Sequence, residues 1–279
     1  MDRTIALGAF DGLHAAHRAV LRGANAVLLF NEHPQKLLRG RAPPQLLSDA
    51  ERDTRLRAAG LELLKIPFEE IAGLSPITFF SEILCKRYHV TALRCGHDYR
   101  FGAHAEGDAA LLKQLCGTHG VDLAIVPRVI FRGEDLSSSR IRAALLDGRT
   151  GEANAMLGRA FGYAFEVVHG ARVGHILGTP TLNQRFPEGF IVPRFGVYAS
   201  RAFVDGAWRA GLTNIGRRPT FDRDELRSET HILRFSGDLY GKRVPVRLLN
   251  FIREERRFET MEALKAQIQI DLKEILCHF

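Results

Sequence analysis

Apolar residues in the first half of the chain form short runs that alternate with helical patterns. The runs TIALGAF, AVLLF, VTALRCG and VDLAIVP precede segments whose apolar residues recur three or four positions apart: HAAHRAVL, SDAERDTRLRAA, DAALLKQLC and SSSRIRAALLDG. Strands that alternate with helices favour a parallel sheet with crossover helices. We therefore expect a Rossmann-like α/β domain in this half.

The second half has a different texture from about residue 160 onward. Strand-like runs follow one another closely between Gly, Pro and Asp residues: AFEVVHG, GVYASRAFVDGAWRAGLTNI, THILRF and VPVRLLNFI. Strands joined by turns, with few helices between them, predict a small antiparallel barrel or sandwich.

The end of the chain, residues 259–279, returns to a helical period. Its apolar residues recur at three- and four-residue steps: Met261, Leu264, Ile268, Leu272 and Ile275. This spacing predicts an amphipathic C-terminal helix that packs on the barrel.

The domain boundary falls in the segment GRTGEANAMLGRAFG, a short helical pattern between glycines. A length of 279 residues is typical of two domains, and a hydrophobic content of 46% is enough for two cores. We expect residues 1–155 to form the α/β domain and residues 156–279 the barrel domain.

Composition narrows the class of protein further. The chain has no apolar run of membrane-spanning length, and its opening MDRTIALGAF does not have the pattern of a secretory signal, so we expect a cytoplasmic protein without a membrane partner. The four cysteines form no CxxC pair, which favours isolated reduced thiols. The net charge of +7 is scattered, which favours small phosphorylated ligands over nucleic acid.

The opening stretch ALGAFDGLHAAHRAVL combines a strand, two glycines and two histidines. In a parallel sheet, a glycine after the first strand lets a phosphate approach the following helix. Gly8 and Gly12 are suitably placed for this, and His14 and His17 lie at i and i+3, where they share a helix face. The i, i+3 spacing does not fit the usual zinc pair, and taken alone it is also typical of surface or capping histidines.

The pattern G-x-F-D-G-x-H-x-x-H in this stretch resembles a known signature, G-x-F-D-G-x-H-x-G-H. That signature belongs to the adenylyltransferase domain of the bacterial bifunctional riboflavin kinase/FAD synthetases. The resemblance implies that His14 and His17 stabilise charge on the transferred group. It implies nucleotide contacts for Gly8, Phe10, Asp11 and Gly12.

Two later segments resemble the same family in the expected order. CGHDYRFG is similar to the family segment that lines the flavin side of the site, which implies flavin contacts for Asp98, Tyr99 and Phe101. SSSRIR is similar to S-S-T-x-I-R, which implies triphosphate contacts for Ser137, Ser138 and Arg140. Alone, SSSRIR is equally typical of a serine N-cap before a helix.

The second half resembles the riboflavin kinase domain of this family over nearly all of residues 160–279. VVHGARVGHILGTPTLN is similar to the segment ending G-F-P-T-A-N, and TNIGRRPTF is similar to the N-I-G-x-R-P-T loop. The resemblance implies that Glu229, before THILRF, is the general base for the 5′-hydroxyl of riboflavin. It implies nucleotide contacts for Gly174, Gly178, Thr181 and Asn183, and flavin contacts for Asn214 and Arg218.

Thr181 and Asn183 also suit a metal on chemical grounds. Two residues apart in an extended segment, they place a hydroxyl and an amide oxygen on one face. Such hard oxygen ligands favour Mg²⁺ that already carries nucleotide phosphates. Glu229, without the surrounding motif, would be one of many solvated acids.

Departures from the family pattern concentrate in the first half. Ala16 replaces the glycine of H-x-G-H, FNEHP stands where the family has F-E-P-H-P, and Ala105 stands where arginine is common. The segment between His17 and Phe30 is also shorter than usual, although a crossover of at least about 10 residues still fits.

The expected function is therefore flavin-cofactor synthesis. The barrel would phosphorylate riboflavin to FMN with ATP, and the α/β domain would adenylylate FMN to FAD with release of pyrophosphate, each with Mg²⁺. A monofunctional riboflavin kinase with a flavin-binding or assembly domain is one alternative, and a basic RNA-associated protein is another. The pattern leaves homo-oligomerisation open.

Overall fold

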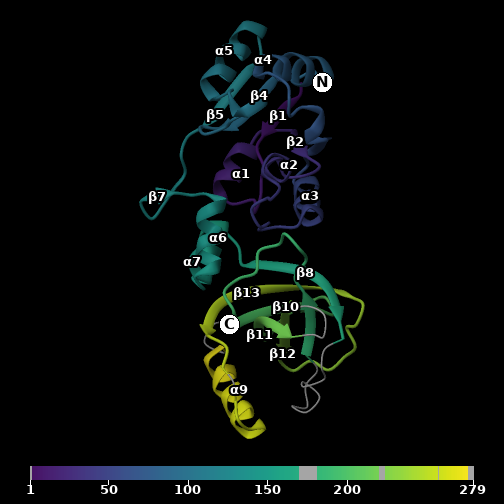
Figure 1. Cartoon of the computed structure of the whole chain (residues 1–279), viewed down its shortest axis with the longest axis vertical. Coiled ribbons are helices and arrows are strands. Elements are labelled where there is room, and N and C mark those ends of the chain that lie inside the picture. The colour runs from purple at the N-terminus through teal and green to yellow at the C-terminus, as the bar shows by residue number, and fades with distance from the viewer. Residues whose placement is uncertain (1, 170–180, 220–223, 257, 276–279) are drawn as a thin grey trace. The chain divides into compact units, whose positions relative to one another are not determined.

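The computed structural model describes residues 2–169, 181–219, 224–256 and 258–275. The chain divides into two compact units, Met1–Ser138 and Ser139–Phe279, coloured purple to teal and teal to yellow in Figure 1. The division falls directly after the first residue of α6 (Ser138–Leu146) and before α7 (Thr150–Leu157), whereas the expected domain boundary after residue 155 lies near the end of α7. That boundary stays a prediction.

The first unit is built on a five-stranded parallel sheet in the order β3-β2-β1-β4-β5. The strands are β1 (Thr4–Leu7), β2 (Ala26–Phe30), β3 (Glu62–Ile66), β4 (Ala92–Gly96) and β5 (Asp122–Val126). The expected Rossmann-like arrangement is confirmed. β3, with the sequence ELLKI, is a strand that the apolar pattern did not predict, because two charged residues interrupt it.

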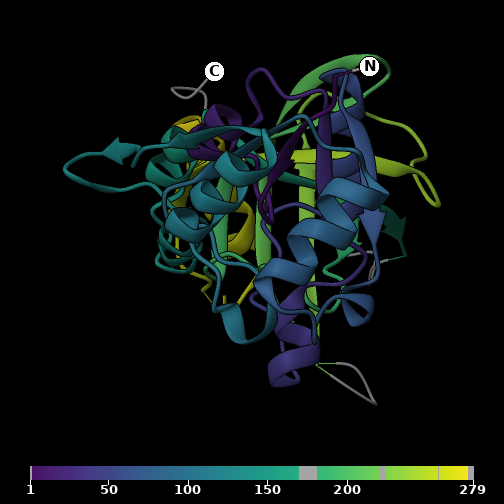
Figure 2. The same cartoon turned by 90° about the horizontal axis from the view of Figure 1, so that it is seen from above.

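Helices and turns connect these strands. They are α1 (Ala15–Leu21), α2 (Pro34–Arg39), α3 (Asp49–Ala58), η1 (Phe68–Glu70), α4 (Pro76–Thr78), the π-helix η2 (Phe79–Arg87), η3 (Ala103–Ala105) and α5 (Ala109–His119). Ser48 and Asp108 cap α3 and α5, since each side chain accepts from the backbone N–H three residues on. The hairpin of β6 (Ile130–Phe131) and β7 (Glu134–Asp135) projects from the unit in both views (Figures 1 and 2).

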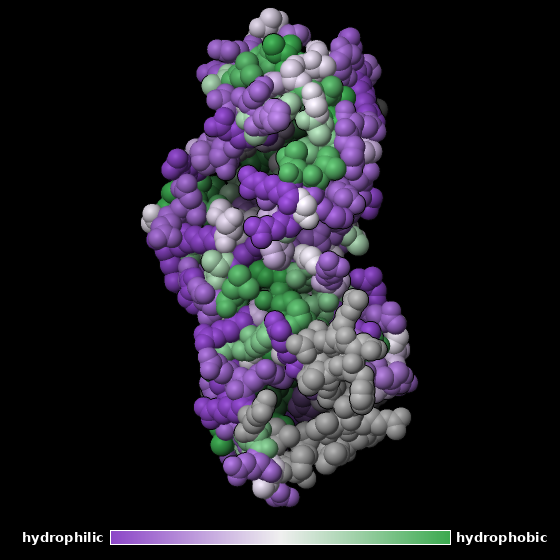
Figure 3. All heavy atoms as spheres, in the orientation of Figure 1, coloured by the Kyte–Doolittle hydropathy of each residue, from purple (hydrophilic) through white to green (hydrophobic). Residues whose placement is uncertain are grey.

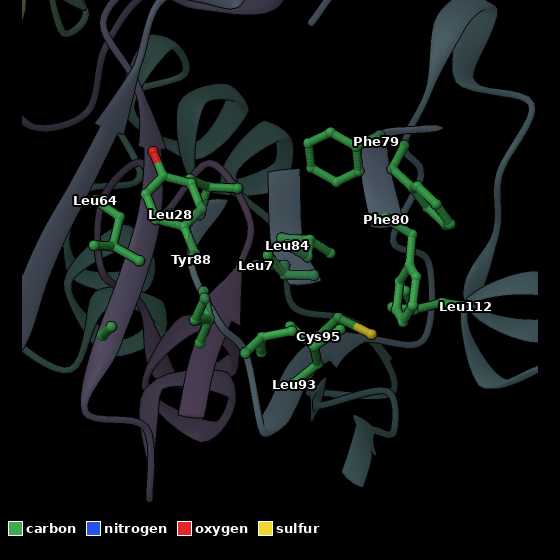
Figure 4. Close-up of a cluster of buried hydrophobic side chains, with 14 of the residues drawn as sticks. Leu7, Leu28, Leu64, Phe79, Phe80, Leu84, Tyr88, Leu93, Cys95 and Leu112 are labelled. Carbon is green, nitrogen blue, oxygen red and sulfur yellow. The ribbon is translucent and has the colours of Figure 1, made fainter. Parts of the chain in front are cut away.

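A hydrophobic core lies between the sheet and the helices η2 and α5. Figure 4 shows how Phe80 and Leu112 approach the strand residues Leu93 and Cys95 from these helices. Cys95 and Cys116 are buried in this cluster, where burial raises the pKa of each thiol to about 11. Both thiols are free, as expected.

The short crossover after the first histidines is accommodated by a helix of only seven residues, α1. Arg94 on β4 donates from Nε to the carbonyl of Val20 at 3.0 Å, near the end of α1. This contact satisfies one of the carbonyls that a longer helix would have bonded internally. The shortened segment therefore keeps a complete βαβ connection.

The second unit contains a closed six-stranded antiparallel barrel in the order β10-β11-β12-β9-β8-β13. The strands are β8 (Phe161–Val168), β9 (Thr181–Arg185), β10 (Gly196–Val204), β11 (Ala207–Pro219), β12 (Asp224–Ile232) and β13 (Arg243–Arg253). Closure leaves no open sheet edge. The structure thus selects the barrel from the two predicted architectures.

The C-terminal helix α9 (Met261–Ile275) packs on the barrel as predicted. Its Leu272 joins a cluster that includes Leu212, Leu249 and Ile252 on the outside of the strands. Asp271, which is 1% exposed, pairs with Arg253 at 2.7 Å, so a buried ion pair fixes the helix to the end of β13.

Candidate active sites

The loop after β1 turns sharply before α1 begins. Phe10 and Leu13 have positive φ angles of 53° and 46°, and Gly12 has a φ of 87°. Glycine adopts this conformation without strain, whereas Phe10 and Leu13 require support from burial. Phe10 is 1% exposed, and a Cβ added to Gly8 would lie 3.2 Å from its ring. The absence of a side chain at Gly8 therefore leaves room for the Phe10 ring.

The two histidines lie against each other at the start of α1. His14 is the N-cap residue, with extended backbone, and the first helical residue is Ala15. The imidazoles of His14 and His17 stack with ring centroids 3.7 Å apart, and Phe10 meets His17 edge-on at 5.5 Å. The predicted common face of the histidines is thus present, and it faces a cavity.

That cavity has a volume of about 800 Å³ and opens at the carboxyl ends of the strands. Its wall includes Gly8, His14, His17, Tyr99 and Ser137. Ala16 also lines it, so the extra methyl group leaves the cavity open. The volume lies within the range of small-molecule sites. Figure 3 shows apolar surface (green) bordered by polar residues (purple) on this unit.

The three residues expected on the flavin side all line this cavity, in different settings. Tyr99 and Phe101 stack nearly parallel, with an interplanar angle of 10°. Burial raises the pKa of the Tyr99 phenol, which therefore stays neutral. The side chain of Asp98 is 82% exposed. The site thus offers an aromatic wall with one exposed carboxylate at its rim.

The SSSRIR segment meets the β1 loop at the start of α6. Ser137 lines the cavity, and Ser138 donates from its hydroxyl to the carbonyl of Asp11 at 2.9 Å. The Asp11 carboxylate accepts from the backbone amides of Leu46 and Leu47 at 2.9 and 3.2 Å. Both contacts hold the loop that carries Phe10 and Gly12.

Arg140 lies two residues into α6, inside the second unit. Its guanidinium lies 3.6 Å from the carboxylate of Glu152 on α7, and both side chains are largely buried. Arg140 is not among the residues that line the cavity.

Sequence reasoning gave no role to two further groups at the cavity. His33, the N-cap of α2, accepts from the Gln35 N–H at Nδ1, so the neutral ring carries its proton on Nε2. Arg128 lies at the base of the hairpin and pairs with Asp135 at 3.4 Å. The sequence signal that could have identified His33 is its position directly before a proline, because proline is common at the first position of a helix. Arg128 could not be singled out from the sequence, because basic residues are scattered along the whole chain.

In the barrel, strand register brings three predicted residues into one row. Glu229 on β12 lies opposite Asn183 on β9 and opposite Asn214 on β11. Directly opposed residues share a sheet face and approach within about 5 Å. The row runs along the outside of the barrel, because the neighbouring Ser228 and Thr230 are fully buried inside it.

Asn183 is 3% exposed and has a fixed amide orientation. Its Nδ2 donates to the carbonyl and hydroxyl oxygens of Thr181 at 3.2 and 3.4 Å. Its Oδ1 is buried and has no hydrogen-bond partner in the described part of the chain. An uncompensated buried acceptor is costly, so this oxygen is suited to a cation or a donor from a ligand.

Asn214 repeats this arrangement on the other side of Glu229. Its Nδ2 donates to Glu255 at 2.9 Å, and its Oδ1 is buried without a partner among the described residues. Next to this row, burial lowers the pKa of the His231 imidazole. Glu255, after β13, was not predicted, because its segment carries several acids and bases that sequence alone does not distinguish.

The remaining predicted residues of the barrel are only partly described. Gly174 and Gly178 lie outside the described residues, as does the side chain of Arg218, whose backbone pairs with Glu225. Among described residues, no group of three His, Cys, Asp or Glu side chains could hold a metal ion. A metal site here would depend on hydroxyl and amide oxygens.

The chain thus has a carboxylate row on a barrel and stacked imidazoles beside a cavity on a parallel sheet, an arrangement that fits a transferase with two nucleotide sites. Comparison with known proteins agrees with this class. Residues 1–140 match the FAD synthetase family, and residues 157–279 match the riboflavin kinase family.

Whole-chain relatives carry both domains. The chain is 34% identical to the bifunctional riboflavin kinase/FMN adenylyltransferase of Escherichia coli, over 96% of this chain and 90% of that protein. It is 32% identical to the protein of the same description from Bacillus subtilis, over 99% of this chain and 92% of that protein. The chain therefore belongs to the bifunctional riboflavin kinase/FMN adenylyltransferase family, an enzyme family of flavin-cofactor synthesis, and the monofunctional alternative is not favoured.

A solved structure supports the fold. A protein from Streptococcus pneumoniae described as a macrolide-efflux protein has a TM-score of 0.88 and 32% identity, with 98% of this chain and 93% of that chain covered. In the part of this chain that the structure describes, no helix is long and apolar enough to cross a membrane.

Proposed function

We propose that the row Asn183–Glu229–Asn214 transfers the γ-phosphate of ATP to riboflavin, and that the cavity beside His14 and His17 joins AMP to the resulting FMN. The register of β9, β12 and β11 is the observation that carries the kinase assignment. It puts the one carboxylate of the row between two buried amide oxygens, which is the setting for a base that receives a hydroxyl proton.

In the kinase step, the 5′-hydroxyl oxygen of riboflavin attacks the γ-phosphorus of ATP. Glu229 takes the proton from that hydroxyl, the bond from the γ-phosphorus to the bridging oxygen breaks, and ADP leaves. Phosphoryl transfer requires mainly positioning and charge stabilisation, so the rigid strand framework suits it. Asn214 and Arg218 would contact the flavin, and Gly174 and Gly178 would leave room for the nucleotide phosphates.

The residues at this site fit Mg²⁺. Thr181 offers a hydroxyl and Asn183 offers a buried amide oxygen that has no partner among described residues. Both are hard oxygen donors of the kind that Mg²⁺ accepts alongside nucleotide phosphates and water. When bound, the ion would neutralise phosphate charge. The Asn183–Thr181 hydrogen bonds preset the amide orientation for this role.

In the adenylyl step, an oxygen of the FMN phosphate attacks the α-phosphorus of ATP, and pyrophosphate leaves. We assign His14 and His17 to stabilising charge on the transferred group, because their stacked rings line the cavity. Ser137 and Ser138 would bind phosphate at the start of α6. The stacked pair Tyr99 and Phe101 offers a flat aromatic surface for the flavin ring, and Asp98 lies at its edge.

The loop residues Gly8, Phe10, Asp11 and Gly12 have a supporting role in this proposal. The Asp11 carboxylate accepts hydrogen bonds from the amides of Leu46 and Leu47, so we infer that it stabilises the conformation of the nucleotide loop. Gly8 and Phe10 form the wall beside His17. We further propose that both reactions take place in the cytoplasm, with small molecules as the only partners of these two sites.

The proposal is tested by incubating the purified chain with riboflavin, ATP and Mg²⁺ and separating the flavins by chromatography. FMN followed by FAD is the expected result. FMN without FAD would restrict the proposal to the barrel, and absence of both products would overturn it. Omission of Mg²⁺ with a chelator is expected to stop both products.

A further inference from the structure

Glu255 lies beside the row Asn183–Glu229–Asn214, on a short segment in which each residue makes a side-chain contact. Arg253 donates to the carboxylate of Asp271 on α9 through Nε and Nη2, at 3.0 and 2.7 Å. Glu254 pairs with Arg194, and Arg194 stacks over the ring of Phe251. Glu255 itself accepts from Asn214 Nδ2 at 2.9 Å. The segment therefore ties the C-terminal helix to the strand that carries Asn214.

The barrel surface has room for this carboxylate because of a glycine. The heavy atoms closest to a Cβ added at Gly216 all belong to the Glu255 carboxylate, and such a Cβ would overlap it. Gly216 lies two residues after Asn214 on the same face of β11. The Glu255 carboxylate thus occupies a defined place on β11.

A carboxylate at this place determines which end of the Asn214 amide faces it. An ionised carboxylate only accepts hydrogen bonds, whereas an amide has a donating and an accepting end. Asn214 must turn Nδ2 toward Glu255, which leaves Oδ1 turned away. That oxygen is buried and has no partner in the described ranges, on the face that Asn214 shares with Glu229.

We propose that Glu255 is a positioning residue for the flavin substrate: it orients Asn214 so that Oδ1 accepts a hydrogen bond from a hydroxyl of the flavin's polyol chain. Phosphate oxygens only accept hydrogen bonds, so an outward amide oxygen favours a hydroxyl over the triphosphate. This inference rests on the proposed kinase function of the barrel. It specifies that Asn214 accepts the hydrogen bond from the flavin, and it identifies Glu255 as the residue that sets this orientation of the amide.

The first test replaces Glu255 by an amide of the same shape. Glutamine at this position can either accept from Asn214 or donate to it, so Glu255→Gln removes the constraint on orientation without removing volume. We expect the riboflavin dissociation constant, measured by flavin fluorescence without ATP or Mg²⁺, to rise about 3- to 10-fold, the effect of losing one hydrogen bond. The KM for MgATP stays unchanged. Glu262→Gln, an exposed acid on α9, is the matched control.

The second test reverses the hydrogen bond. In the double variant Glu255→Gln with Asn214→Asp, the new amide donates to the new carboxylate, and a carboxylate oxygen again faces the substrate. Riboflavin affinity is expected to return to within about twofold of the original. Asn214→Asp alone sets two carboxylates against each other and is expected to weaken binding more than either other variant. A structural role for Glu255 would give no such rescue.

Gly216→Ala provides an independent route, because its methyl group takes the place of the Glu255 carboxylate; it too should weaken flavin binding. Unchanged riboflavin affinity in Glu255→Gln, a changed KM for MgATP with unchanged flavin affinity, or a double variant no better than the single ones overturns the inference. A wild-type chain that makes no FMN instead overturns the proposed function, so the two failures are distinct.

Discussion

In the barrel, neighbouring strands bring the site residues together, whereas in the α/β unit they come from loops and helix starts that are far apart in the sequence. Asn183, Glu229 and Asn214 are aligned by backbone hydrogen bonds between three adjacent strands. The stacked histidines instead depend on a loop in which Phe10 and Leu13 have positive φ angles.

This difference explains how the two units accommodate change. A strand register admits no partial shift, because a slip by one residue turns each side chain to the other face. A loop site can absorb local changes, and the departures from the family pattern lie there: Ala16 at the cavity wall, Ala105 in η3 and the shortened α1. The cavity of about 800 Å³ persists despite them.

The largest expected effect is on the barrel carboxylate. Glu229→Gln keeps the shape of the row but removes the base, so FMN formation from riboflavin should fall about 10²- to 10⁴-fold. The rate is measured by chromatography of the products, with circular dichroism as the check on folding. Glu166→Gln, an exposed acid on β8, should keep the original rate. Near-normal FMN production by a folded Glu229→Gln variant would contradict the role of Glu229.

The next effect tests the loop-built site. His14→Ala and His17→Ala each remove one of the stacked rings, and adenylylation of supplied FMN should fall about 10²- to 10³-fold, as for the loss of a donor to a charged transition state. The exposed His89 provides the control His89→Asn, which suits its φ of 50°. FAD production at the original rate by both alanine variants would mean that the histidines are not catalytic.

A smaller effect distinguishes the proposed roles of Asn183 and Asn214, which lie on either side of Glu229. Asn183→Ala removes the amide oxygen proposed for Mg²⁺, so the KM for MgATP should rise by about tenfold, corresponding to one lost ligand contact. Riboflavin affinity, measured by fluorescence, should remain within about twofold, since Asn214 lies on the other side of Glu229. Loss of riboflavin affinity with unchanged use of MgATP would contradict this assignment and would mean that Asn183 binds the flavin.

The smallest effect concerns stability of the shortened crossover. Arg94→Met removes the hydrogen bond to Val20 near the end of α1 and should lower the free energy of unfolding of the α/β unit by about 0.5–1.5 kcal/mol. Trp208, the single tryptophan, lies in β11 and reports the barrel. The urea midpoint of the Trp208 fluorescence transition should not move, while the circular dichroism transition of the α/β unit should shift to lower urea concentration. A shift of the Trp208 transition as well would mean that the units unfold together.

Much of this architecture could be predicted from the sequence, because most elements have a strong local pattern. The four strand–helix alternations of the first half gave the parallel sheet, and the strand-like runs of the second half gave the barrel. β3 was missed because Glu62 and Lys65 interrupt its apolar run. η2 was missed even though two of its buried residues, Phe80 and Leu84, lie four positions apart, which is the spacing of a helical face.

The site was predictable to the extent that it follows local motifs. HxxH gave the shared face of His14 and His17, and the two-residue spacing of Thr181 and Asn183 gave their common strand face. Contacts between distant segments were not predictable. The amide of Asn214 meets Glu255 across 41 positions, and Asp11 meets Leu46 across 35, and only the folded chain brings these groups together.

The central claim is that one chain performs two reactions at two separate sites, and a crossed assay tests it most directly. Glu229→Gln and His14→Ala are each given either riboflavin or FMN, with ATP and Mg²⁺. The account predicts that Glu229→Gln makes FAD from FMN but almost nothing from riboflavin, while His14→Ala makes FMN from riboflavin and almost no FAD from either flavin. Loss of both reactions in either folded variant, or of neither, would contradict the account.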